Sequence, residues 1–170
     1  MRFLDVHPYR STVADRMTSI LPVPWPGLTT IGQKRTFMQI RPFQQADASD
    51  VFRLLTANGW QHRIPSIDYL RELVAASQRA MVAVDGGRTV GFARAITDGL
   101  SNGYLSMVVV EASCQGQGIG TQLVERIVGD EPQVTWVLRA GREGAHGFFS
   151  KLGFTASADA MERVRRTAAQ

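Results

Sequence analysis

The sequence predicts a mixed α/β fold, and three observations support this prediction. Apolar runs typical of strands are interspersed with stretches of helical spacing, in an order that suits one sheet with flanking helices. Gly, Pro, Ser and Asp residues stand where those elements should begin and end. The composition, with 44% hydrophobic and 20% charged residues among 170, is that of one globular domain with a real core and excludes general disorder.

A strand and two helices are expected first. Residues Phe37–Arg41 alternate as a strand does, and Pro42 ends it. Asp47 is expected to cap the first helix, which Gly59 follows, and Ser66 to cap the second. Their apolar stripes are Val51, Leu54 and Leu55 in the first helix and Leu70, Leu73 and Val74 in the second.

Three strands should follow these helices. Ala80–Val84 and Arg88–Ile96 flank the turn Asp85-Gly86-Gly87, which is a strong signal for a hairpin. Tyr104–Val110 is a run of strand-forming residues that is too apolar for an edge, so we expect it in the centre of the sheet.

The last predicted elements alternate between helix and strand. Thr121–Val128 and Ala145–Leu152 have helical spacing, and Gly153 ends the second of these helices. Val134–Leu138 is expected to be a buried strand, and Met161–Arg165 a final strand. The predicted order is therefore strand, two helices, three strands, helix, strand, helix and strand.

The first part of the chain differs from the rest. Residues 1–36 are rich in Pro around Leu21–Gly27 and lack hydrophobic periodicity, which indicates an irregular extension before a domain at 37–170. No run approaches the roughly 20 apolar residues that a bilayer requires, so no membrane partner is expected. The single cysteine, Cys114, excludes an intrachain disulfide and a cysteine-rich zinc site. A cytoplasmic protein without a bound metal is the expectation.

The charge balance is mildly basic. The chain has 19 Lys and Arg residues and 15 Asp and Glu residues, which gives a net charge of +4. The basic residues are scattered, apart from Arg163, Arg165 and Arg166 near the C-terminus, and such runs are usually solvated. An affinity for an anionic small molecule fits equally well. A nucleic-acid partner, resting on net charge alone, is not expected.

The clearest chemical signal is a glycine-rich turn, Gln115-Gly116-Gln117-Gly118-Ile119-Gly120, between a buried strand and a helix. Its backbone N–H groups and the start of the helix would receive a phosphate or pyrophosphate, unless the turn is purely structural. A Walker A loop is excluded, because the chain's lysines are Lys34 and Lys151. The dinucleotide fingerprint is weak, because Thr121 stands where its third glycine should be.

A third phosphate-binding pattern fits. Gln115-x-x-Gly118-x-Gly120 resembles the acyl-CoA signature, Q/R-x-x-G-x-G/A, of the GNAT superfamily of N-acetyltransferases. The stretch from Ala145 to Phe154 is similar to the family's second CoA-facing motif, and Ile40-Arg41-Pro42 to its opening strand. This resemblance, over residues 37–166, implies the GNAT fold, with a mostly antiparallel sheet of about six to seven strands and about four helices.

The resemblance also implies which residues bind acetyl-CoA, the expected cosubstrate. The backbone of Val110 would bond the pantetheine arm, and the N–H of Val108 would point at the acetyl carbonyl. The turn and the Thr121 hydroxyl would hold the pyrophosphate. The implied cofactor-binding residues are Val108, Val110, Gln115, Gly116, Gln117, Gly118, Gly120, Thr121 and Phe149.

Phe149 is a departure from the family, since many members carry a tyrosine there that protonates the departing CoA thiolate. We predict Tyr104, at the start of the central strand, as the catalytic residue instead. It should face the same side as Ser106 and Val108 unless a bulge intervenes. A merely packed tyrosine is the structural alternative; His146, Glu111, Asp98 and water are the other candidates for the proton transfers.

The resemblance predicts an enzyme that moves an acetyl group directly from CoA to a primary amine of a small molecule or peptide. The loops Asn58–Pro65, with Trp60 and His62, and Thr97–Gly103, with Asp98, should face this substrate. Trp60 and Asp98 would suit an amine, and ordinary loop packing is the alternative for Trp60. The alternative is a non-catalytic acyl-CoA-binding module or sensor, which Phe149 motivates. A homodimer is left open, with the extension and the last strand as its expected interface.

Overall fold

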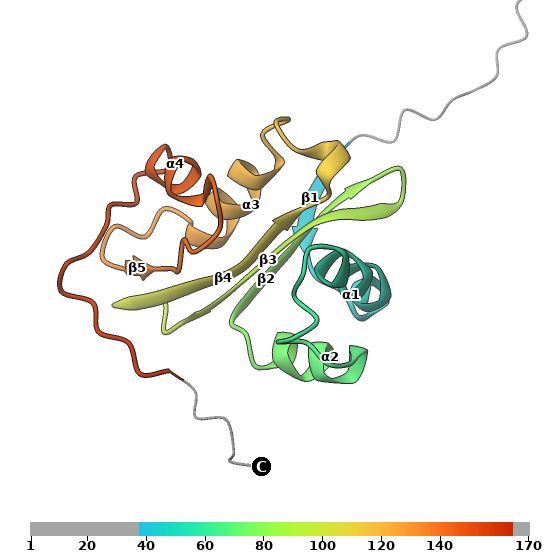
Figure 1. The fold of residues 1–170 in the computed structure, drawn as a ribbon, viewed down its shortest axis with the longest axis horizontal. Helices are drawn as coiled ribbons and strands as arrows, with labels where there is room; N and C mark the ends of the chain where they lie inside the picture. Colours follow the sequence, from blue (N-terminus) through green and yellow to red (C-terminus); the bar gives the residue numbers. More distant parts are fainter. Residues whose placement is uncertain (1–37, 165–170) are drawn as a thin grey trace, which may run out of the picture. The chain divides into compact units, whose positions relative to one another are not determined.

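The computed structural model describes residues 38–164, so the predicted extension over residues 1–36 lies outside the described residues. Within this range five strands form one sheet, in the order β1-β2-β3-β4-β5 (Figure 1). The elements in chain order are β1 (Gln39–Pro42), the 3-10 turn η1 (Gln45–Asp47), α1 (Ala48–Ala57), α2 (Ile67–Ala75), β2 (Arg79–Asp85), β3 (Arg88–Thr97), β4 (Asn102–Val110), the 3-10 turn η2 (Ala112–Cys114), α3 (Ile119–Val128), β5 (Thr135–Val137) and α4 (Ala145–Ser150).

The sheet is mostly antiparallel, as predicted. The first four strands pair antiparallel, and β5 joins β4 in parallel through three residue pairs, from Asn102–Thr135 to Tyr104–Val137. The expected central position of Tyr104–Val110 is confirmed, since β4 lies between β3 and β5.

The described part of the chain has fewer strands than the six to seven expected. The predicted strand at Met161–Arg165 is absent over Met161–Val164, where Met161 is 100% exposed and Val164 70% exposed. A strand needs a neighbouring strand for its backbone groups and a face to bury, and these residues have neither. β5 is also shorter and less buried than expected, with Val137 46% exposed, because it is the edge strand of the described sheet.

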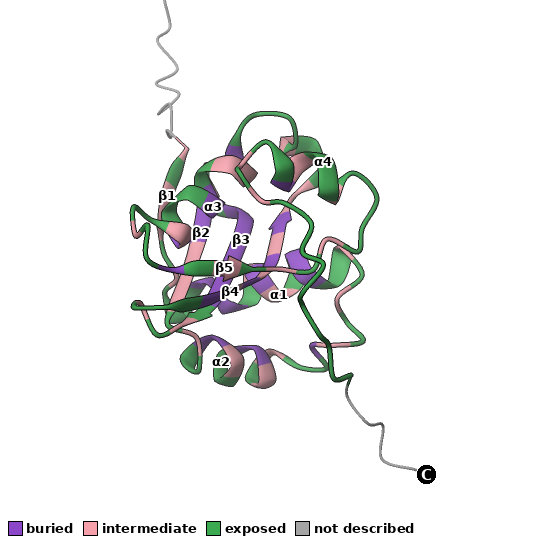
Figure 2. Ribbon diagram, turned by 90° about the vertical axis from the view of Figure 1, so that its left-hand side faces the viewer, coloured by how far each residue is buried: buried purple, intermediate pink, exposed green. Residues whose placement is uncertain are grey.

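Helices cover both faces of the sheet. Helices α1 and α2 pack on one face and α3 and α4 on the other (Figure 1). Buried residues concentrate on the inner strands and on the helix surfaces that face them (Figure 2). Fully buried side chains on the α1 side include Leu54, Leu55, Leu70 and Phe92, and those on the α3 side include Leu105, Ile119, Leu123 and Ile127. None of the helices in residues 38–164 is both long enough and apolar enough to cross a membrane.

The two predicted helix caps have different outcomes. Ser66 caps α2, since its Oγ accepts a hydrogen bond from the Tyr69 N–H at 3.1 Å. Asp47 precedes α1 but does not cap it, because its carboxylate accepts from both terminal nitrogens of Arg41, each at 2.7 Å, and from the Gln44 N–H. Burial acts to raise the pKa of Asp47, but these donors outweigh it and hold the pKa below its ordinary value.

A β-bulge interrupts β4 and decides which way its side chains point. Phe92 pairs with Val109 and Arg94 with Ser106, so Met107 and Val108 together lie opposite Ala93. Met107 has a φ of 55°, in the left-handed region. As a result, Leu105 and Val108 pack on the α3 side, whereas Met107 and Val109 pack on the α1 side. The expectation that Tyr104 and Ser106 share a face with Val108 therefore fails.

A candidate acetyl-transfer site at the open edge of β4

The candidate site begins where β4 loses its neighbour. Because β5 pairs with β4 only as far as Tyr104, the rest of that edge has no neighbouring strand in the described sheet. The Glu111 N–H bonds to the Val90 carbonyl of β3 at 2.8 Å, so the backbone groups of Val110 point to the open side. Consistent with this, the Val110 carbonyl accepts from Gln115 Nε2 at 3.0 Å. An extended ligand could pair with the outward backbone groups of this edge, where it would compete with Gln115 for the Val110 carbonyl.

A cleft of about 610 Å³ lies along this edge. The end of β4, the glycine-rich turn, the start of α3 and the residues around α4 form its walls. The cleft-lining residues that had been predicted to bind acetyl-CoA are Val108, Val110, Gln115, Gly116, Gly118, Gly120, Thr121 and Phe149. Gln117 does not line it; its exposed side chain lies 3.4 Å from the Ser113 carbonyl, to which it donates.

The glycines of the turn have different physical roles. Gly116 and Gly118 have φ values of 76° and 78°, where a side chain is strained, although a Cβ at Gly116 would meet nothing within 4 Å. Gly118 is the N-cap of α3 and provides no side-chain cap, so the first N–H groups of this helix remain available. At Gly120, a Cβ would lie 3.2 Å from Phe148 Cζ, so this glycine allows α3 and α4 to approach closely.

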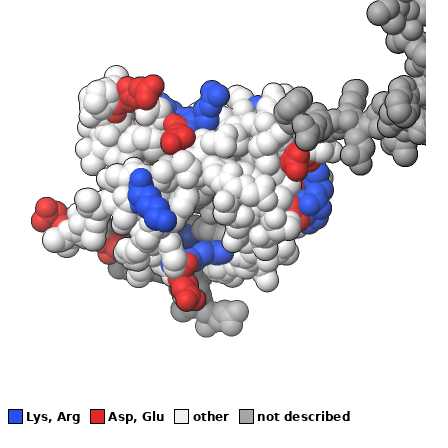
Figure 3. All heavy atoms as spheres, turned by 90° about the horizontal axis from the view of Figure 1, so that it is seen from above, with Lys and Arg blue, Asp and Glu red and all other residues white. Residues whose placement is uncertain are grey.

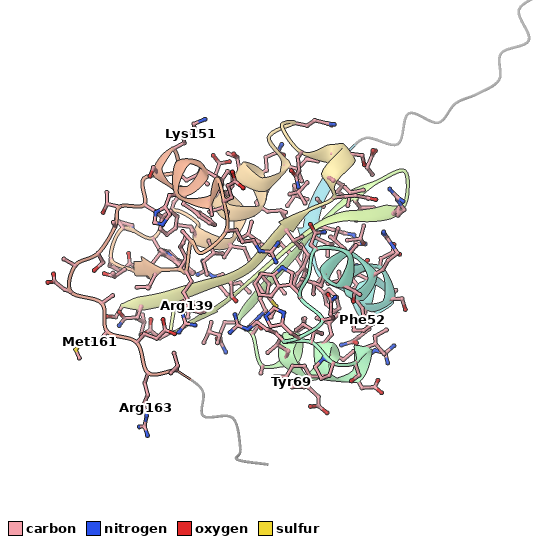
Figure 4. The ribbon with its side chains drawn as sticks, viewed as in Figure 1. Phe52, Tyr69, Arg139, Lys151, Met161 and Arg163 are labelled. Atoms are coloured by element: carbon pink, nitrogen blue, oxygen red, sulfur yellow. The ribbon has the colours of Figure 1, made fainter. Side chains whose placement is uncertain are left out.

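Phe149 contributes to the cleft while belonging mainly to the core. It is 9% exposed and packs edge-to-face against Phe148 at 4.9 Å and Phe154 at 5.7 Å between ring centroids. Lys151, also at the cleft, is exposed and points away from α4 into solvent (Figure 4).

Tyr104 lies at the far end of the same region. A second cavity, of about 320 Å³, shares Val108, Arg142 and Phe149 with the cleft and is also lined by Tyr104. Tyr104 and Val108 reach this cavity from opposite faces of β4, because the sheet separates where β5 diverges from β4. The gap between two strands thus brings Tyr104 together with Val108 and Phe149, whereas the glycine-rich turn lines only the cleft.

Comparison with known proteins identifies this arrangement. Residues 76–156 match the family described as an acetyltransferase (GNAT) domain. These residues are a GNAT acetyltransferase domain. The match begins just before β2 and ends beyond α4, so it includes the bulged strand, the glycine-rich turn and Phe149.

Individual relatives agree with this assignment. The chain is 42% identical over 77 residues to serotonin N-acetyltransferase 2, chloroplastic, of Oryza sativa subsp. japonica, a match that covers 44% of this chain and 38% of that protein. A GNAT family acetyltransferase from Streptococcus pneumoniae superposes with a TM-score of 0.64 and 26% identity, over 77% of this chain and 100% of that one. Glucosamine-6-phosphate N-acetyltransferase from Arabidopsis thaliana shares the fold, with a TM-score of 0.59, 17% identity and coverage of 75% and 98%.

The other titratable groups considered for this GNAT site lie in less suitable places. His146 is exposed and lines neither the cleft nor the cavity beside Tyr104. Glu111 pairs with Arg88 at 2.7 Å. The Asp98 carboxylate accepts hydrogen bonds from the N–H groups of Leu100, Ser101 and Asn102, which lower its pKa to about 2. Asp98 therefore organises its loop rather than serving as a base.

One titratable residue of the site was expected to face the substrate but was given no role in proton transfer. His62 lines the cavity beside Tyr104, and its Nδ1 lies 3.0 Å from the Gly59 carbonyl. The signal was its position in the loop Asn58–Pro65, which had been expected to face the substrate. A neutral imidazole there has the chemistry of a general base.

The environment of Trp60 favours loop packing, since it is partly buried against the core on the α1 side. The guanidinium groups of Arg142 and Arg63 lie 5.0 and 5.8 Å from its ring centroid, so the chain itself provides its cation–π partners. Arg142 also donates to the Asn58 carbonyl at 2.7 Å and so connects the loop after α1 to the loop before α4. A cationic amine at Trp60 would meet these two positive charges.

The charges on the surface are dispersed. On the face drawn in Figure 3, the Lys and Arg side chains of the described residues stand singly among uncharged and acidic ones. Charged side chains of both signs are therefore mixed on that face.

Proposed function

We propose that this chain transfers an acetyl group from acetyl-CoA directly to a primary amine. The observation that carries the proposal is the open edge of β4, which runs from the bulge at Met107 to the glycine-rich turn. Because the matched region covers 38% of the rice relative, the activity is inferred from the site and the family together.

The residues of the cleft suit acetyl-CoA. The left-handed backbone at Gly116 and Gly118 and the free N–H groups of the ten-residue helix α3 are suited to a pyrophosphate, with the Thr121 hydroxyl beside them. The outward backbone groups of Val110 suit the amide groups of a pantetheine arm, as in the addition of a strand. The cleft volume of about 610 Å³ is within the usual range of small-molecule sites.

Acetyl transfer requires a thioester, stabilisation of the oxyanion and two proton transfers. Acetyl-CoA supplies a thioester, whose carbonyl carbon forms the new bond to the amine nitrogen while the carbon–sulfur bond breaks. The Val108 N–H, at the bulge where the strand ladder is interrupted, would stabilise the negative charge that develops on the carbonyl oxygen. The amine must lose a proton, to water or to His62, and the thiolate must gain one.

We assign the proton donor to Tyr104. Phe149 has no proton to give, and Tyr104 is the hydroxyl-bearing aromatic residue that shares a cavity with Phe149 and Val108. A thiolate is a tolerable leaving group at neutral pH, since an ordinary thiol has a pKa of about 8.5. Loss of the donor should therefore slow the reaction without abolishing it.

Two measurements test the proposal. Acetyl-CoA at 100 times its Kd should stabilise the protein by about 2.7 kcal/mol in a thermal unfolding assay. Incubation with acetyl-CoA and a panel of primary amines should release free thiol. The absence of both effects would contradict the proposal.

The second candidate function, a non-catalytic acyl-CoA-binding module, is favoured by one observation. Phe149 is held in the core by two aromatic neighbours, so the general acid of many relatives is replaced by a packed side chain. Stabilisation by acetyl-CoA without thiol release from any amine would select this candidate over the enzyme.

A further inference from the structure

Arg94, in the middle of β3, is a buried cation without a counter-ion in the described part of the chain. Its side chain is 7% exposed, and none of the ion pairs among residues 38–164 includes it. Nη1 donates to Ser77 Oγ at 2.8 Å, whereas Nε is buried and has no hydrogen-bond partner. Most of the five N–H donors of this guanidinium group therefore form no hydrogen bond to a described side chain.

A comparison with Arg79 shows how unusual this is. Arg79 is more exposed, at 21%, yet it forms a two-point ion pair with Glu131 at 2.6 Å and donates to the Ile127 carbonyl at 2.7 Å. Burial lowers the pKa of Arg94, because removal from water penalises its charge. A buried charge normally has a partner of opposite sign.

Arg94 lines a cavity of about 560 Å³ on the α2 side of the sheet, which we call the arginine cavity. Tyr69 from α2, Ser106 from β4 and Tyr104 complete its inner wall. Ser106 lies directly opposite Arg94 in the β3–β4 pairing, and Tyr104 is two residues before it. The arginine cavity therefore begins at the residue to which we assign the proton transfer.

The rim of the arginine cavity adds positive charge. Arg63 and Arg139 line it, and the described carboxylate there, Glu162, is paired with Arg139 at 2.6 Å. Arg163 also lines it but extends away from the fold, and Tyr69 lies on α2 (Figure 4). The cavity thus combines a buried guanidinium group that no described carboxylate pairs with and a cationic entrance, which is the environment that an anionic group requires.

We infer that the arginine cavity binds a carboxylate or phosphate group of the acceptor, so that the acceptor is a small amine that also carries an acid. This inference rests on the proposed acetyl transfer and identifies the substrate class. The acid pairs with Arg94, and the amine of the same molecule lies toward Tyr104 and the cavity shared with Val108 and Phe149.

The test compares amines that differ only in the acid. Tyrosine and tyramine form the carboxylate pair, and O-phosphoethanolamine and ethanolamine form the phosphate pair. Binding is measured directly by calorimetry on the full chain, and turnover by thiol release with acetyl-CoA. In at least one pair the acidic member should bind about tenfold or more tightly than its partner. The pair that shows this preference identifies the acid.

The variant Arg94→Gln should remove this preference. We expect the affinity for the acidic member to fall by roughly 10²-fold, with KM rising more than kcat falls, while the affinity for acetyl-CoA is unchanged. Arg71→Gln is the matched control, because Arg71 is an exposed arginine of α2 paired with Asp68, and it should leave the preference intact. If Arg94→Gln does not fold, Arg63→Gln at the rim of the cavity should lower the affinity for the acidic member several-fold.

The failures can be told apart. Two results would overturn the inference. One is that Arg94→Gln changes the affinity equally for both members of each pair, and the other is that the wild-type protein shows no preference for the acidic member in either pair. Neither result would contradict acetyl-CoA binding or thiol release with amines that carry no acid. Conversely, selective binding of the acidic member without any thiol release would support the anion site and contradict the proposed transfer.

Discussion

The two ends of the site are built in different ways. At one end, the glycine-rich turn and the start of α3 are a single stretch of chain, from Gln115 to Thr121, that carries its own conformational requirements. At the other end, the cavities around Tyr104 combine side chains from the α1–α2 loop, α2, β3, β4 and the segment after β5. A local motif therefore provides the cofactor end, whereas tertiary packing assembles the acceptor end.

The largest effect is expected at the cofactor end. Gly118→Glu should reduce acetyl-CoA affinity by 10²-fold or more, because a carboxylate would face the pyrophosphate at about the distance where like charges cost several kcal/mol. A Cβ at Gly118 meets only Gln122 Nε2, at 4.0 Å, so the domain should remain folded. Calorimetry and circular dichroism measure the two effects.

The matched control for this variant is Gly118→Ala. Its φ of 78° strains any side chain, so the alanine should lower stability by about 1–2 kcal/mol but leave most of the acetyl-CoA affinity. Equal losses of affinity in both variants would mean that backbone strain, rather than charge, is responsible. Intact affinity in Gly118→Glu would mean that the phosphates lie elsewhere.

At the acceptor end, Tyr104→Phe should lower kcat by about 10²-fold, the usual scale for a lost general acid, with little effect on acetyl-CoA affinity. Thiol-release kinetics at saturating acetyl-CoA measure this. The change removes one hydroxyl from a half-buried side chain, so the protein should fold normally.

Phe149→Tyr is the complementary change. Alone it should alter kcat by less than about tenfold, and in the double variant a tyrosine there should partly restore the activity lost with Tyr104. Full activity in Tyr104→Phe would refute the assignment and direct attention to water or His62. His146 is no longer a candidate of equal merit, because it lines none of the three cavities.

A smaller effect is expected from Arg142, which connects the two loops over the cleft through its hydrogen bond to the Asn58 carbonyl. Arg142→Met keeps much of the side-chain length but removes the donor and the charge over Trp60. We expect a stability loss of about 1 kcal/mol or less and a several-fold higher KM for the acceptor. An unchanged KM with the same stability loss would show that this contact is only structural.

The smallest effect concerns Asp98, which lies outside the site. Its pKa is lowered to about 2, so its contribution to stability is present above the unfolded pKa of about 4 and lost as pH falls to about 2. Asp98→Ala should therefore be less stable than wild type at pH 7, and most of this difference should be lost over that range. Denaturant unfolding at several pH values measures it, and a difference that is as large at pH 2 as at pH 7 would exclude the carboxylate as its source.

Much of the fold could be predicted because its signals are local. The hairpin turn at Asp85-Gly86-Gly87, the Ser66 cap and the helical stripes depend on neighbouring residues, and each occurs as expected. The predictions that failed depend on how one element meets another. Asp47 bonds back to Arg41 of β1 instead of capping α1, and Met161–Val164 find no strand to pair with.

The sequence by itself determined the fold class and the glycine-rich turn, since a left-handed backbone and a free helix start are properties of consecutive residues. Only the tertiary structure decided where Tyr104 faces, because the bulge at Met107 shifts the alternation of β4 by one residue. The tertiary structure likewise decided that Arg94 is buried without a counter-ion among residues 38–164 and shares a cavity with Tyr104. The physical reason is that burial and charge pairing depend on segments far apart in the chain, which a local pattern does not encode.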